Sequence, residues 1–89
     1  MRQPANRAER ERRLAVALAA PEERQRLRWA DQQRAREELQ RAHAEARAAL
    51  ISGDAQAIRA AARRTERATA LLTATLDQTR WLHYYGVSE

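Results

Sequence analysis

A single break, Ser52-Gly53-Asp54, interrupts an otherwise continuous run of helix-forming residues, and it constrains the fold more than any other feature of the chain. Glycine adopts the left-handed conformation that ends many helices, and an aspartate side chain accepts hydrogen bonds from the first free N–H groups of a following helix. We therefore expect Gly53 just past the end of one helix and Asp54 at the N-cap of the next. The stretch from Leu39 to Thr79 then forms an antiparallel helical hairpin.

Local signals predict three helices in a single domain of 89 residues. Pro21 followed by two glutamates favours a helix start, because proline lacks an N–H that would be unpaired there and acidic side chains favour the positive end of a helix. The predicted helices span about residues 5–20, 21–51 and 54–85, and residues 86–89 are predicted to be a frayed tail. The expected fold is all-α, a small three-helix protein built on the long hairpin.

Placing successive residues 100° apart predicts which side chains of the hairpin face each other. On the second predicted helix, one face is mostly small and apolar: Arg28, Gln32, Ala35, Leu39, Ala42, Ala46, Ala49 and Leu50. On the third, the expected core residues are Ile58, Ala61, Ala62, Thr65, Ala68, Thr69, Leu72, Leu76, Thr79 and His83. Helices that meet through alanine approach closely, so we expect tight antiparallel packing.

The core that these faces supply is thin. Alanine is the commonest residue of the chain, and each alanine removes little apolar area from water. A lone hairpin of this composition is weak, so a third helix, a second copy of the chain or a protein partner is expected to cover it. The first predicted helix, whose Leu14, Ala17 and Leu18 form one apolar edge, is expected to pack on the open end of the hairpin.

The charge of the chain comes from arginine. There are 17 basic residues, all arginine, against 12 acidic residues, so the formal net charge is +5. We define the arginine stripe as four residues of the third predicted helix, opposite its core face: Arg59, Arg63, Arg64 and Arg67. Such a stripe, with aromatic residues further along the helix, suits contact with nucleic acid through phosphates and stacked bases. The alternative is a solvated helix face whose arginines reflect codon usage.

The aromatic residues are the best candidates for contact with a protein partner. Trp81, Tyr84 and Tyr85 lie near the C-terminus, and Trp29 is the only other large aromatic residue. Tryptophan and tyrosine are enriched at binding hot spots, so these four residues are predicted to bind a partner. The structural alternative is that they close the open end of the bundle against Leu14.

No motif indicates catalysis, a cofactor or a metal site. The chain has no cysteine, which excludes disulfides and thiolate ligands, and neither serine neighbours a histidine. In the antiparallel register, His43 and His83 lie on the order of 30 Å apart at 1.5 Å per residue, too far to share a metal ion. We expect neither an enzyme nor a cofactor or metal.

The apolar run over residues 14–20 is much shorter than the ~20 residues that span a bilayer, and glutamates precede it, unlike the positive region of a secretory signal. We therefore expect a cytoplasmic protein with no membrane span. The sequence favours a non-enzymatic protein–protein interaction module, a small adaptor, chaperone or inhibitor that covers its partner with a helical face. Two hairpins sharing a core as a homodimer fit the same pattern, and nucleic-acid binding through the arginine stripe is the alternative function.

Overall fold

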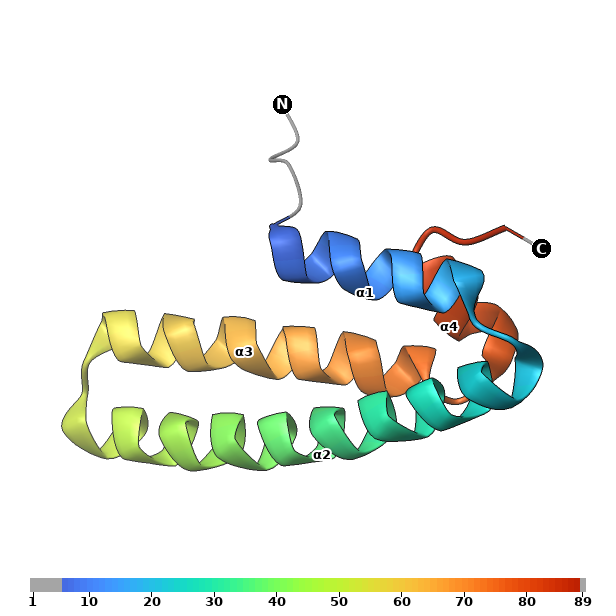
Figure 1. Ribbon diagram of the computed structural model, residues 1–89. Helices are drawn as coiled ribbons and strands as arrows, with labels where there is room; N and C mark the ends of the chain where they lie inside the picture. The colour runs from blue at the N-terminus through green and yellow to red at the C-terminus, as the bar shows by residue number, and fades with distance from the viewer. Residues whose placement is uncertain (1–5, 89) are drawn as a thin grey trace.

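The computed structural model describes residues 6–88, and every regular element in that range is an α-helix (Figure 1). The order is α1 (Arg7–Leu18), α2 (Pro21–Ser52), α3 (Ala55–Ala74) and α4 (Gln78–Tyr84). The long helices α2 and α3 lie side by side and antiparallel, while α1 and α4 lie together near the open end of this hairpin. The predicted all-α fold based on a helical hairpin is confirmed.

The hairpin turns at Gly53, as predicted. Gly53 has a φ of 72°, and its N–H donates to the carbonyl of Ala49 at 2.9 Å. Asp54 caps α3, because its side chain accepts hydrogen bonds from the N–H groups of Gln56 and Ala57 at 2.9 and 3.3 Å. These bonds satisfy backbone groups that the two helix ends leave unpaired.

Alanine forms the contact line between α2 and α3. Buried alanines recur every seven positions, at Ala35, Ala42 and Ala49 on α2 and at Ala61 and Ala68 on α3, and the C-terminal end of α3 adds buried Leu71 and Ala74. Seven residues are about two helical turns, so each row runs nearly straight along its helix. The hairpin helices therefore meet through small side chains and bury little apolar area against each other.

The prediction of one helix over residues 54–85 is wrong, because the chain breaks between α3 and α4. At the break, the carbonyl of Thr75 accepts a hydrogen bond from the guanidinium of Arg28 on α2 at 3.0 Å. Asp77 then caps α4 by accepting from the N–H of Arg80 at 2.8 Å. These side chains replace the helical hydrogen-bond pattern at this point. Residues 6–88 therefore contain four helices rather than three.

The break directs α4 toward α1 and builds a second core at the open end. Its buried members are Val16, Trp81 and Leu82, with Leu27, Tyr85 and Val87 packed around them. The predicted apolar edge of α1 is wrong, since Leu14 and Leu18 are mostly exposed. Val16, two positions from each, points to the opposite side of the helix and enters the core.

Within the predicted frayed tail over residues 86–89, Val87 is instead packed against the fold, while Gly86 and Ser88 are exposed. Gly86 has a φ of 72°, and the N–H of Val87 donates to the carbonyl of Leu82 at 2.9 Å. This bond is the long hydrogen bond of a Schellman motif, and the partly buried Val87 supplies the apolar contact that accompanies it. Glu89 lies outside the described residues.

Candidate interaction face

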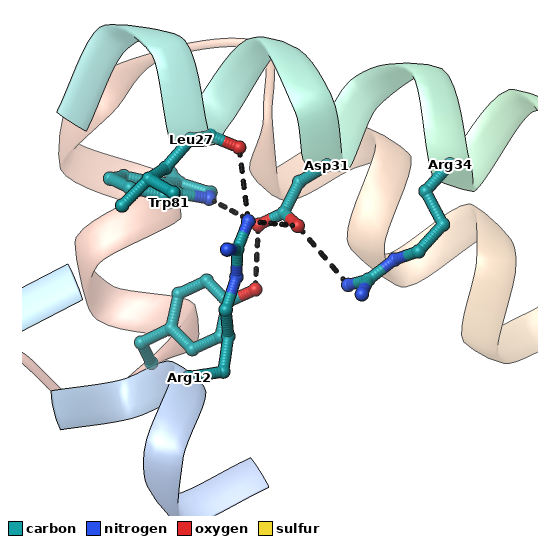
Figure 2. A network of polar contacts seen from close by, with 6 residues as sticks. Arg12, Leu27, Asp31, Arg34 and Trp81 are labelled. Atoms are coloured by element: carbon teal, nitrogen blue, oxygen red, sulfur yellow. Dashed lines mark hydrogen bonds and ion pairs between the residues drawn. The ribbon is translucent and has the colours of Figure 1, made fainter. Parts of the chain in front are cut away.

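The carboxylate of Asp31 on α2 is almost fully buried and lies among four polar side chains (Figure 2). Its Oδ1 lies 2.8 Å from Arg12 Nη2 of α1 and 3.1 Å from Arg34 Nη2. Its Oδ2 accepts hydrogen bonds from Trp81 Nε1 at 2.9 Å and from Tyr85 Oη at 2.6 Å. Both oxygens are satisfied, as a buried charge requires, and the cluster joins α1, α2 and the α4 region.

Arginine side chains fasten α1 to the hairpin. Besides contacting Asp31, the Arg12 guanidinium donates to the backbone carbonyl of Leu27 at 3.2 Å. At the other end of α1, Arg24 donates to the carbonyls of Val16 and Ala17, both at 3.3 Å, and the Val16 carbonyl also accepts from the N–H of Ala19 at 3.4 Å. Charge-assisted bonds of this kind explain how a short helix with a single buried residue is held in place.

Tyr85 takes part in the cluster as a hydrogen-bond donor. Burial, followed by its hydrogen bond to Asp31, raises the pKa of Tyr85 to about 12, so the hydroxyl keeps its proton at neutral pH. Its ring meets Trp81 edge-on, with 5.6 Å between ring centroids. The cluster is therefore a support for the open end of the fold.

The structure separates the four aromatic residues that were predicted to bind a partner. Trp81 is fully buried inside the monomer, so it is not available to a partner and this prediction is wrong. Tyr85 is partly buried and its hydroxyl is bonded to Asp31. Trp29 is 61% exposed and Tyr84 is 48% exposed. They line different hollows, of about 280 Å³ beside Trp29 and 390 Å³ beside Tyr84, so they do not form one site.

The arginine stripe lies on the solvent side of α3. Three of its members are exposed and make no ion pair with any residue between 6 and 88: Arg59, Arg63 and Arg67. Arg64 differs, because it forms an ion pair with Glu45 across the hairpin. The predicted continuation into an aromatic platform is wrong, since the helix ends before Trp81 and that residue is buried.

On α2, the surfaces on the two sides of the buried row Ala35, Ala42 and Ala49 differ in character, and we call them its flanks. A step of 100° per residue places charged residues on one flank, while the other flank is uncharged from Leu39 to Leu50 and carries Arg28 and Arg36 before that stretch. The charged flank carries Arg34, Glu38, Arg41 and Glu45. The uncharged flank carries Gln32, Leu39, His43, Ala46 and Leu50.

The same division holds for α3, and the flanks of the two helices match. Arg64 and Arg67 lie on the charged flank of α3, and the uncharged flank carries Ile58, Ala62, Thr65, Thr69 and Leu72, with Leu76 just beyond the helix. The ion pair between Glu45 and Arg64 joins the two charged flanks on one side of the hairpin. The two uncharged flanks therefore share the opposite side.

The helices α1 and α4 cover only the charged side. Tyr84 of α4 lines one hollow with Glu38 and Arg64, and a second hollow with Arg12 of α1 and Arg34 of α2. Both hollows lie along the charged flanks. Among residues 6–88, no helix is therefore packed on the opposite side of the hairpin.

We define the uncharged face as the residues on this open side: Leu39, His43, Ala46, Leu50, Ile58, Ala62, Thr65, Thr69, Leu72 and Leu76. Leu50 and Leu76 are 66% and 62% exposed. Five others are half-buried by their neighbours along the hairpin: Leu39, Ala46, Ile58, Thr65 and Leu72. A largely apolar face of this kind, with His43, Thr65 and Thr69 as its polar members, is typical of an interaction site on a charged protein.

Part of the predicted core of α3 lies on this open side. Ala61 and Ala68 are buried against α2 as predicted, but Ala62, Thr69 and Leu76 are exposed. The residues predicted as core cover about half of the circumference of the helix. A contact between two helices buries a narrower strip than this, and here the strip lies along one edge of the predicted face. Two further predicted core residues, which follow the break, are also exposed: Thr79 and His83.

The described residues contain no cluster suited to a metal. Both histidines are exposed, and no three histidine, aspartate or glutamate side chains between residues 6 and 88 come close enough to hold an ion. Within that same range, no helix combines the length and the apolar character that crossing a membrane requires.

Comparison with known protein families, curated proteins and solved structures finds no match for this chain. The inference of function therefore rests on two surfaces, the uncharged face and the arginine stripe.

Proposed function

We propose that this protein is a non-enzymatic protein–protein interaction module that binds a helical partner through the uncharged face. The supporting observation is that α2 from Leu39 to Leu50 and α3 from Ile58 to Leu72 keep charge away from the one side that α1 and α4 leave open. One third of the residues in this chain are charged, so a charge-free face along both helices is distinctive. Such a face can be covered without burying an unpaired charge, which would be costly.

The side chains of the face suit an amphipathic helix. Small residues such as Ala46 and Ala62 allow close approach of a second helix, and leucines toward the ends, such as Leu50 and Leu76, supply anchoring contacts. The partner is expected to present apolar residues at three- and four-residue spacing. An adaptor, a chaperone and an inhibitor all act through contacts of this type.

Crosslinking in cells tests the proposal. A photoreactive residue is placed at Thr69, on the uncharged face, or at Ala70, which is also exposed on α3 but points toward the arginine stripe. We expect irradiation to give protein adducts from position 69 and few or none from position 70, read by immunoblot and identified by mass spectrometry. Equal adducts from both positions, or none from position 69, would contradict the proposal.

Nucleic-acid binding through the arginine stripe is a second candidate. Its supporting observation is that Arg59, Arg63 and Arg67 are exposed along one side of α3 without an ion pair to any residue between 6 and 88. Together with the net charge of +5, these side chains offer contacts to phosphate. Contacts of this kind position a protein on nucleic acid and read little sequence.

A salt titration of binding to short single- and double-stranded DNA tests this second function. If the stripe binds phosphates, the alanine variant of Arg59, Arg63 and Arg67 should reduce the slope of log K against log salt by about two to three. The matched control removes three other exposed arginines: Arg13, Arg36 and Arg47. The stripe has no such role if the protein fails to bind at low salt, or if both triple variants lower the slope equally.

A further inference from the structure

We infer that the partner on the uncharged face is a second copy of this chain, with the two hairpins packed face to face as a four-helix bundle. This inference rests on the proposed function, because it names the occupant of the same face. Three properties of the hairpin support it: its thin core, the placement of its charges and the size of the face.

The half of the hairpin near Gly53 needs a permanent cover. The helices α1 and α4 pack at the other end, so in this half α2 and α3 have only each other. Their contact there consists mainly of Ala42, Ala49 and Ala61, whose burial contributes little. Most of the stability of a helix in a protein comes from packing an apolar face, so these helices require further contacts whenever they are folded. A second copy is always present to supply them.

The charges favour self-association through this face. Two copies that each carry a net charge of +5 repel each other, and an arginine buried between them would add a large desolvation cost. The uncharged face avoids both arginine and glutamate, whereas the opposite side carries residues such as Arg34 and Glu38. An acidic protein partner would bind the arginine stripe, because opposite charges attract there. The uncharged face has no charged side chain that could attract such a partner.

The face has the dimensions of a small dimer interface. Along α2 it extends from Leu39 to Leu50, which is about 17 Å at 1.5 Å per residue, and along the α3 side from Ile58 to Leu76, which is about 27 Å. Two helices packed 8–10 Å apart make it roughly 20 Å wide. Two such faces bury on the order of 900 Å² in total, which is the size of a weak, transient interface.

The sizes of the side chains also fit. Ala46 and Ala62 lie one turn in from the Gly53 end of the face, which is formed by Leu50 and Ile58, and Leu72 and Leu76 lie at the other end. Helices that cross at small residues come closest there, and the larger side chains fill the space that opens on either side of the crossing.

Sedimentation equilibrium of the purified full chain tests the inference, with two variants matched in chemistry and helix. Ala62→Glu adds a charge to the uncharged face, and Ala70→Glu adds the same charge to the side of α3 that carries the stripe; both alanines are exposed. We expect a dimer at micromolar concentration, a dissociation constant raised about 100-fold or more by Ala62→Glu, and little change with Ala70→Glu.

Crosslinking of single-cysteine variants tests the dimer even if Ala62→Glu prevents folding. The chain has no cysteine, so a single introduced thiol is unique. We expect a flexible bismaleimide to link two copies of Thr69→Cys efficiently and two copies of Ala70→Cys poorly.

The inference that the partner is a second copy would be contradicted if the chain stays monomeric at all concentrations. It would also be contradicted by a dimer that persists in Ala62→Glu and whose two copies are not crosslinked through Thr69→Cys. The proposed function is judged separately. It survives a monomeric chain when position 69 forms adducts with a different protein in cells, and it fails when position 69 forms none.

Discussion

Replacing Asp31 by alanine is expected to lower the free energy of unfolding by about 3–5 kcal/mol, the typical cost of removing one partner from a buried ion pair. The variant leaves Arg12 without its carboxylate and leaves Trp81 Nε1 with no acceptor in the core. A domain of this size has a total stability of only about 5–10 kcal/mol. The open end of the bundle, including the attachment of α1, should therefore melt at much lower temperature.

Urea denaturation followed by circular dichroism measures this loss. The matched control is Asp54→Ala, which removes an exposed helix cap and should cost about 1 kcal/mol. Asp31→Asn keeps an acceptor oxygen but not the charge, so its loss should fall between the two. If Asp31→Ala costs no more than Asp54→Ala, the cluster does not support the fold as described.

Replacing Trp81 by alanine should lower the free energy of unfolding by about 3–5 kcal/mol. The substitution removes the largest buried side chain and leaves a cavity in the core. The same change at the other tryptophan, Trp29, should cost less than about 1 kcal/mol, because most of that side chain is already in water. The two variants remove the same atoms, so the difference between them measures the burial of Trp81 together with its hydrogen bond to Asp31.

Thermal unfolding provides the comparison. For a domain of this length, each kcal/mol corresponds to about 4–8 °C in Tm, so Trp81→Ala should melt at least ~8 °C below Trp29→Ala. Tryptophan fluorescence gives an independent check: Trp29→Phe, which keeps only Trp81, should emit at shorter wavelength than Trp81→Phe. Similar losses from the two alanine variants would place Trp81 outside the core, in conflict with the structure.

The elements that could be predicted from the sequence are those set by neighbouring residues. The turn at Gly53, the cap at Asp54 and the start of α2 at Pro21 depend on side chains and backbone groups within four positions of each other. Capping and backbone preference act over this range, so their sequence signals are sufficient. The alanine rows of the hairpin also follow from helical periodicity once the turn is known.

The break between α3 and α4 could not be predicted in this way. It depends on Arg28 of α2, which reaches the carbonyl of Thr75 from 47 residues away. Missing it also misplaced Trp81, because the non-helical residues at the break change the direction in which every later side chain points. Extending the helical period of α3 through residue 85 therefore places Trp81 on the surface with the arginine stripe, whereas the structure buries it in the core.

Asp31 was missed for the same reason. In sequence it is one polar residue among arginines and glutamines, as on any solvent-exposed helix. Arg12, Trp81 and Tyr85 reach it from 19, 50 and 54 residues away. The sequence by itself determined the hairpin, because turns and caps are local. Only the tertiary structure decided which carboxylate is buried and which side of the hairpin stays open, because both depend on where α1 and α4 pack.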